Sequence, residues 1–170
     1  LDKKLGWTER LAAGVLDDRN PLFIVHSMHD LFRQRIFQIA LGYEDCDDAD
    51  RLRTDPLLKA ACGRHPVEDP DLASQPTFSR FENRRDAVDV FGLNHALVEH
   101  YVARRKGRPA PRRIVIDIDP TDDPTHGQQE LSFFHGYYDQ WMYHPILVFD
   151  SRGYPVAALL RPGNAHARWG

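Results

Sequence analysis

Cysteine is scarce in this sequence of 170 residues, which contains only Cys46 and Cys62. Both lie in segments predicted to be helical, so neither a disulfide framework nor a four-ligand zinc site is expected. Long apolar runs are lacking too, because no span reaches the about 18 apolar residues of a transmembrane helix. The N-terminal residues also lack the charged and then apolar arrangement of a secretory signal. These absences predict reduced thiols, a cytoplasmic location and no membrane partner.

A phosphate-binding glycine loop, a dinucleotide fingerprint and a serine-hydrolase elbow are absent, so nothing indicates a nucleotide cofactor. Overall positive charge is absent as well, since the formal net charge is -3. That charge gives no global attraction to a phosphate backbone. Basic residues nevertheless gather ahead of an acidic cluster, at Arg104, Arg105, Lys106, Arg108, Arg112 and Arg113. They form either a solvated linker or a phosphate-binding stretch.

The first hundred residues show helical periodicity. Apolar residues recur every three or four positions over residues 28–41. Ser27 and Asp30 precede this run with the pattern of a capping box, which predicts the start of the helix. Asp55 and Pro56 predict the cap and first turn of a second, shorter helix.

A long helix is predicted over residues 80–103, where apolar residues keep helical spacing despite Gly92. Ser79 and Glu82 have the spacing of a capping box at its start. Glycine and prolines then end the helix within residues 106–111. We therefore expect a domain boundary there.

Beyond this boundary the apolar period changes from about 3.6 to about 2, which is typical of strands. The boundary separates a helical region, 1–106, from a strand-rich region, 107–170. A β-branched run over 113–119 predicts a strand that Pro120 ends. Three further segments are predicted to be strands, residues 133–143, 145–149 and 154–160. Their short connections predict antiparallel pairing.

The densest set of possible ligands lies at the end of the predicted strand 113–119. Residues two apart in a strand face the same side, so Asp117 and Asp119 project together. Two carboxylates on one face repel each other unless a cation lies nearby, and Mg²⁺ prefers oxygen ligands. The pair is therefore a candidate metal site. The alternative is a strand that emerges into solvent, with Asp122 and Asp123 capping the following turn.

His126 has three possible roles, as a metal ligand, a contact to DNA phosphate or a turn residue before Gly127. The aromatic residues between 133 and 143 have two possible roles, stacking on bases or packing within a sheet. Spacing alone leaves these alternatives open.

Several strings of the sequence, taken in order, resemble the DDE transposases of bacterial insertion sequences. These strings are residues 40–50, 72–83, 116–130 and 160–164. The resemblance runs through nearly the whole chain. It implies an α+β fold, in which an N-terminal helical region that contributes to DNA binding precedes the first antiparallel strands of a ribonuclease-H-like catalytic domain.

The resemblance also implies roles for individual residues. Asp119 is followed by Pro120 and Thr121, similar to the Asp-x-Thr pattern of related transposases, which implies that Asp119 is the first catalytic aspartate and a metal ligand. Asp117 is the alternate for both roles. The basic stretch between Arg104 and Arg113 is implied to contact DNA.

Such transposases use three carboxylates and two Mg²⁺ or Mn²⁺ ions to cut the element's ends and join them to target DNA. In the family, the second aspartate and the glutamate come from a later strand and a later helix, and the sequence stops before either. We therefore expect a fragment with an incomplete catalytic domain, which binds transposon ends and target DNA, can self-associate and is inactive alone. Whether the chain is itself an enzyme stays open.

Two other hypotheses remain. The chain is a non-catalytic DNA-binding module if residues 104–113 hold phosphate and the carboxylates are structural. It is a small metal-dependent phosphohydrolase if Asp122, Asp123 and Glu130 complete a site with Asp119. Salt-sensitive DNA affinity that survives Asp119→Ala would favour the first, and Mg²⁺-dependent cleavage by the chain alone would favour the second.

Overall fold

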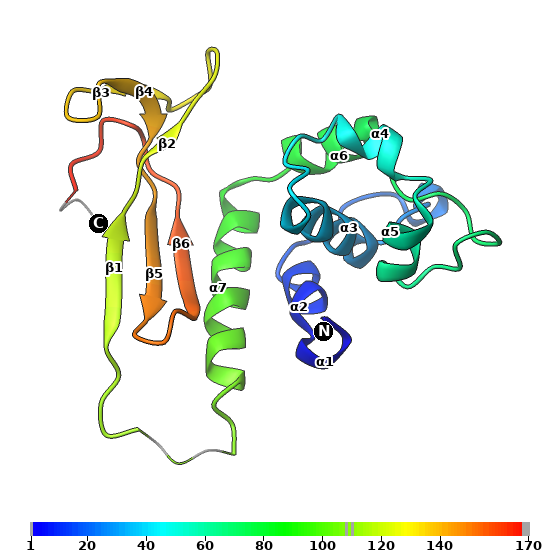
Figure 1. Ribbon diagram of the computed structural model, residues 1–170, viewed down its shortest axis with the longest axis horizontal. Helices are drawn as coiled ribbons and strands as arrows, with labels where there is room; N and C mark the ends of the chain where they lie inside the picture. Colours follow the sequence, from blue (N-terminus) through cyan, green and yellow to red (C-terminus); the bar gives the residue numbers. More distant parts are fainter. Residues whose placement is uncertain (1, 108, 110, 168–170) are drawn as a thin grey trace. The chain divides into compact units, whose positions relative to one another are not determined.

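The computed structural model describes residues 2–107, 109 and 111–167. Helices come first and strands follow, so the chain has the predicted α+β composition (Figure 1). It divides into two compact units, Leu1–Ala96 and Leu97–Gly170, and each is described by itself. Among the described residues, no helix combines the length and the apolar character that crossing a membrane requires.

The first unit is helical. Its elements are α1 (Asp2–Leu5), α2 (Trp7–Ala13), η1 (Pro21–Phe23), α3 (Met28–Ala40), α4 (Asp48–Leu52), α5 (Pro56–Ala61), α6 (Gln75–Asn83) and the first part of α7 (Ala87–Ala103). The predicted capping box of α3 is confirmed, because Ser27 and Asp30 exchange side-chain to backbone hydrogen bonds. The predicted cap of α5 is confirmed too, since the Asp55 carboxylate accepts a 2.7 Å hydrogen bond from the backbone N–H of Leu58.

The prediction of one helix over residues 80–103 is wrong. The segment is divided between α6 and α7, and Ser79 lies inside α6 instead of at a helix start. The physical reason is Asp86, whose carboxylate oxygen accepts hydrogen bonds from the backbone N–H groups of Val88 at 2.9 Å and Asp89 at 3.0 Å. A side chain that satisfies these groups begins a new helix.

The core of the first unit lies between α3, α6 and the loop before α6. Phe32 and Phe81 pack edge to face with 5.0 Å between ring centroids. The buried amide of Gln34 accepts a hydrogen bond from the backbone N–H of Ala73 at 2.8 Å and donates one to its carbonyl at 2.9 Å. This pair of bonds fixes the loop against α3, because a buried amide requires its partners.

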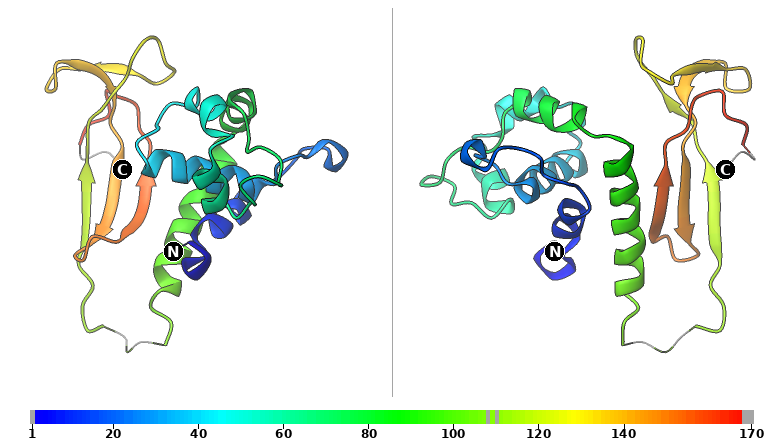
Figure 2. Two further views of the ribbon diagram at one scale, coloured as in Figure 1. Left: turned by 45° about the vertical axis from the view of Figure 1, so that its right-hand side comes forward. Right: turned by 180° about the vertical axis from the view of Figure 1, so that it is seen from behind.

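In its described residues, the second unit contains the C-terminal part of α7 and six strands. Three of these strands, β1, β5 and β6, lie side by side (Figures 1 and 2). Its strands are β1 (Ile116–Pro120), β2 (Asp123–Pro124), β3 (Phe133–His135), β4 (Gln140–Tyr143), β5 (Ile146–Asp150) and β6 (Pro155–Leu159). They form two antiparallel three-stranded sheets, in the orders β1-β5-β6 and β2-β4-β3. Thr121 follows β1 and Pro145 precedes β5, so both lie where the chain passes from one sheet to the other. The backbone N–H of Thr121 donates a 3.0 Å hydrogen bond to the carbonyl of Pro145 and joins these two connections.

The predicted strands 145–149 and 154–160 are confirmed as β5 and β6, but a single strand over 133–143 is wrong. This segment is a hairpin, β3 and β4, with a turn between them. The carbonyl of His135 accepts hydrogen bonds from the N–H groups of Tyr138 at 3.1 Å and Asp139 at 2.9 Å, and these bonds close the turn.

The segment 161–165 packs against the sheet β2-β4-β3. Arg161 is buried and exchanges two hydrogen bonds with His144. The Nε of Arg161 donates one of 2.9 Å to the carbonyl of His144, and the backbone N–H of His144 donates one of 3.1 Å to the carbonyl of Arg161. The N–H of Gly163 donates to the carbonyl of Leu131 at 3.1 Å. This packing gives part of the string 160–164 a structural role in the second unit.

Candidate functional site

The strand β1 carries both predicted catalytic carboxylates. Asp117 and Asp119 are exposed, and they pair across the sheet with Phe149 and Leu147 of β5. Directly paired residues point to the same face of a sheet, so the two carboxylates share a face with these half-buried apolar side chains. Because the sheet order is β1-β5-β6, both stand on an edge strand.

The other acidic residues of the region do not join this pair. The Asp122 carboxylate accepts a 3.0 Å hydrogen bond from the Gln140 side chain, and Asp123 lies in β2. Within the described part of the chain, no group of three His, Cys, Asp or Glu ligand atoms within 4.8 Å of one another includes Asp117 or Asp119. The phosphohydrolase hypothesis requires Asp122, Asp123 and Glu130 to complete a metal site with Asp119. The described residues do not bring these ligands together.

The two aspartates fit a divalent metal ion as part of its coordination shell. Residues two apart in an antiparallel strand have Cα atoms about 6.8 Å apart. Mg²⁺ lies about 2.1 Å from each oxygen ligand, so the two oxygens bound to one ion are at most about 4 Å apart. Asp117 and Asp119 can therefore share an ion only if their side chains bend toward each other. Otherwise one carboxylate binds alone and further oxygen ligands are needed.

The basic stretch begins at the end of α7, where two of its arginines contact other residues of the second unit. The guanidinium of Arg104 lies over the ring of Tyr154, 3.9 Å from its centroid. Arg105 donates a 2.7 Å hydrogen bond to the Tyr101 hydroxyl, which donates one of 3.2 Å to the carboxylate of Asp150. These contacts hold the guanidinium groups of Arg104 and Arg105 near Asp150, in the second unit.

Asp150 is the buried acceptor of this network. Burial raises the pKa of its carboxyl, but the N–H groups of Tyr154 and Arg152, the Tyr101 hydroxyl and the charge of Arg105 together hold that pKa below its ordinary value. Asp150 is therefore ionised at neutral pH and anchors the arginines around it. Next to it is a cavity of about 340 Å³, which we call the α7 recess, lined by Tyr101, Arg104, Arg105, Pro109, Pro111, Asp150, Arg152 and Tyr154.

The rest of the basic stretch lies on the connection from α7 to β1. Lys106, Arg112 and Arg113 are exposed there, and Arg108 lies outside the described residues. Sequence reasoning missed Arg152, which is in the turn between β5 and β6. Spacing could not have identified it, because Arg152 is far from the end of α7 in the sequence and lines the same recess only in the folded unit.

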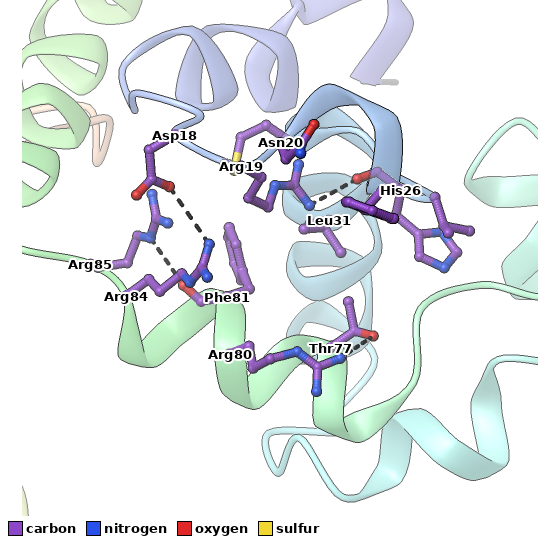
Figure 3. Close-up of a pocket in the computed structure, with 13 residues that line it drawn as sticks. Asp18, Arg19, Asn20, His26, Leu31, Thr77, Arg80, Phe81, Arg84 and Arg85 are labelled. Carbon is purple, nitrogen blue, oxygen red and sulfur yellow. Dashed lines mark hydrogen bonds and ion pairs between the residues drawn. The ribbon is translucent and has the colours of Figure 1, made fainter.

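A second basic cavity lies in the first unit and was also missed. This α6 recess has a volume of about 480 Å³ and is shown in Figure 3. Its lining residues are Asp18, Arg19, Asn20, Phe23, Val25, His26, Met28, Leu31, Thr77, Arg80, Phe81, Arg84 and Arg85. One signal was present in the sequence, the spacing of Arg80 and Arg84 by four residues, which places them on one face of a helix.

Charged groups around the α6 recess are paired to different degrees. Arg19 forms a 2.6 Å ion pair with Asp17. The hydrogen bond from the Arg19 guanidinium lowers the pKa of the Asp17 carboxyl, and this effect exceeds the opposite effect of burial. Arg85 lies 2.9 Å from the carboxylate of Asp89. Burial, followed by the charge of Arg64, lowers the pKa of His26, so this imidazole is neutral at neutral pH.

The whole sequence, compared with families of known proteins, gives one clear result. A family model described as "Transposase DDE domain group 1" matches residues 1–169. The chain belongs to this transposase family. Neither a curated protein nor a solved structure matches it. The match confirms the resemblance found in the sequence, and DDE transposases in general use divalent metal ions and bind DNA.

Family membership agrees with the architecture of this transposase chain. Helices precede small antiparallel sheets, as expected for part of a ribonuclease-H-like domain. The predicted reduced state of its cysteines is also in accord with the structure, where Cys46 and Cys62 are both free.

Proposed function

We propose that this chain contributes Asp119 as the first catalytic aspartate in the metal-dependent DNA cleavage and strand transfer of an insertion sequence. One observation carries the proposal. In a chain of the DDE transposase family, Asp119 is exposed on the edge strand β1, one residue before that strand ends. Asp117 is the alternate, because it lies on the same face of β1.

The metal ion would be Mg²⁺ or Mn²⁺, held by Asp119 alone or together with Asp117, and it would supply Lewis-acid activation of the attacking oxygen. The carboxylate of Asp119 provides a hard oxygen ligand. Its neighbours on that face of the sheet are the half-buried Leu147 and Phe149.

DNA contacts are proposed for the basic stretch. Lys106, Arg112 and Arg113 are exposed and can approach phosphates of transposon ends or target DNA. Arg104 and Arg105 are positioned by Tyr154 and Tyr101 at the α7 recess. Arg108 belongs to the same stretch by sequence. In this proposal, residues 1–106 are a DNA-binding region and residues 107–170 the start of the catalytic domain.

We also propose that these 170 residues do not complete strand transfer alone. Three carboxylates are needed for two metal ions in the family mechanism, and the described residues place no third ligand beside Asp117 and Asp119. The exposed edge of β1 is one surface through which self-association can proceed, because unpaired strand edges can pair with another chain.

Paramagnetic Mn²⁺ is expected to broaden the amide NMR signals of residues 117–119 selectively, because the ion binds the carboxylates of β1. The substitution Asp119→Asn should abolish this broadening. The matched control Asp122→Asn should leave it unchanged, since Asp122 is already hydrogen bonded to Gln140. Broadening centred on another acidic cluster, such as Asp45 and Asp47, would contradict the proposal.

Plasmid nicking tests whether the catalytic metal site is complete within these 170 residues. The wild-type chain with Mg²⁺ is expected to leave supercoiled plasmid intact. Nicking that disappears in Asp117→Asn/Asp119→Asn would show a complete metal site within these residues and would support the phosphohydrolase alternative.

The double substitution Arg112→Ala/Arg113→Ala is expected to make duplex DNA affinity less dependent on salt. Removing one arginine–phosphate interaction reduces the slope of log K against log salt by about 0.9, so removing two reduces it by about 1.8. Fluorescence anisotropy over a range of KCl concentrations measures this slope. The control is Ile114→Ala, which shortens a side chain that is 49% exposed in the same connection without removing a charge. An unchanged slope in the double variant would remove these arginines from the DNA interface.

A further inference from the structure

The α6 recess has the size and shape of a ligand site. Its volume of about 480 Å³ lies within the range of small-molecule pockets, about 300 to 1,000 Å³. Residues before α3 and the start of α3 form one side, and α6 with Arg84 and Arg85 forms the other (Figure 3). All of its lining residues belong to the first unit. The recess is therefore independent of Asp119.

Positive charge dominates the lining, which includes four arginines and one aspartate. Two of these arginines are strongly engaged, Arg19 with Asp17 at 2.6 Å and Arg85 with an aspartate at 2.9 Å. Arg80 and Arg84 are held more loosely. The Arg80 guanidinium lies 3.5 Å from the Thr77 hydroxyl, at the limit of a hydrogen bond.

Arg84 faces Asp18 across the recess at 3.7 Å, and their side chains are 52% and 68% exposed (Figure 3). An ion pair this long and this exposed contributes little energy. An incoming anion can therefore displace Asp18 from Arg84 at small cost. Arg80 lies four residues earlier on the same helical face. Its guanidinium is directed toward Thr77 (Figure 3), and rotation about its side-chain bonds would bring it to a phosphate bound by Arg84.

An aromatic ring lies at the rim of the same recess. Phe23 is 81% exposed and Val25 is 77% exposed, whereas the floor is formed by the buried Met28, Leu31 and Phe81. An exposed ring beside arginines is the combination that single-stranded nucleic-acid sites use, with bases stacked on the ring and phosphates bound to the cations. A paired base in a duplex is already stacked on its neighbours and presents no free face to Phe23.

We propose that the α6 recess binds one unpaired nucleotide of single-stranded DNA, with its base against Phe23 and its phosphate between Arg80 and Arg84. The choice of DNA over another nucleic acid rests on the proposed function. The proposed function would then include a contact between the helical first unit and an unpaired DNA strand. This contact requires neither a metal ion nor Asp119.

The test is fluorescence anisotropy of the full 170-residue chain with a labelled oligothymidine and with a labelled blunt-ended DNA duplex, both in EDTA. Phe23→Leu removes the ring but keeps an apolar side chain, and it is expected to weaken oligothymidine binding about 5- to 100-fold. Phe23→Trp keeps a stacking surface and is expected to retain the affinity. Duplex affinity should change less than about twofold in both variants, because a paired base has no free face to stack on Phe23.

Two further variants complete the design. Arg80→Ala/Arg84→Ala should weaken oligothymidine binding and reduce its salt slope by about 0.7 for each arginine that binds phosphate. Leu22→Ala is the control, because Leu22 is adjacent to Phe23 and 87% exposed but does not line the recess.

Three outcomes would overturn the proposal. Equal weakening of oligothymidine and duplex binding by Arg80→Ala/Arg84→Ala would make the recess a duplex phosphate contact. Equal loss of affinity in Phe23→Leu and Phe23→Trp would show that the ring does not stack. Unchanged affinity in every variant would place the DNA elsewhere. Mn²⁺ broadening at residues 117–119 is measured separately, so failure of the metal site and failure of this site are distinguishable.

Discussion

Gly163→Ala is expected to disrupt the packing of segment 161–165 on the sheet β2-β4-β3. A Cβ atom at Gly163 would lie 1.9 Å from the carbonyl oxygen of Met142, 2.6 Å from that of Phe133 and 2.9 Å from the nitrogen of Phe133. All three are backbone atoms of paired strands, which cannot rotate away as a side chain can. The alanine must push the segment off the sheet or separate β3 from β4.

Displacement of this segment removes several bonds together. The N–H of Gly163 loses the carbonyl of Leu131, and the paired bonds between His144 and Arg161 are strained. Overpacking of this kind costs typically about 1 to 3 kcal/mol, and we expect the upper end here because backbone has to move. Hydrogen exchange of the β3 and β4 amides measures the effect, and we expect their protection to fall.

Gly136→Ala is the matched control. Gly136 is exposed in the turn between β3 and β4, and a Cβ atom there would meet nothing within 4 Å. We expect its effect to stay within about 0.5 kcal/mol. Similar protection in Gly163→Ala, Gly136→Ala and the wild type would show that segment 161–165 can shift without loss of stability.

Gly92→Ala is expected to destabilise the first unit, although alanine normally stabilises a helix interior by about 1 kcal/mol relative to glycine. The reason is the close approach of α7 to the end of α2. A Cβ atom at Gly92 would lie 1.8 Å from the carbonyl oxygen of Gly14 and 3.0 Å from its carbonyl carbon. We expect a net loss of about 2 kcal/mol, since the clash exceeds the gain in helix propensity.

Hydrogen exchange of amides in α2 and α3 follows the effect of Gly92→Ala on the first unit. Val88→Ala lies in the same helix at a side chain that is 75% exposed, and it is expected to be neutral or slightly stabilising. Gain of protection in Gly92→Ala would mean that α2 and α7 separate at little cost.

Helix starts illustrate how far local patterns carry. Ser27 with Asp30, and Asp55 with Pro56, were recognisable because a cap forms between residues two or three positions apart. The break between α6 and α7 was missed, although it is also local. Asp86 supplies its cap, but the continuous apolar spacing over 80–103 concealed it.

The candidate sites show the same contrast. The strand that bears Asp119, and the shared face of Asp117 and Asp119, follow from an alternating pattern within seven residues, 113–119. The α6 recess joins the residues around Arg19 to those around Arg84 and has no such pattern. Its arginines come together because α3 and α6 share a core.

Family membership, the order of helices and strands, and the position of the two aspartates could be obtained from residues and their near neighbours. Those features depend on periodicity and on side chains a few positions apart. The edge position of β1, the contact of Gly92 with Gly14, that of Gly163 with Met142, and both arginine recesses required the folded chain. They depend on which distant segments pack together, and the free energy of that packing is shared among many side chains, so no short stretch of sequence specifies it.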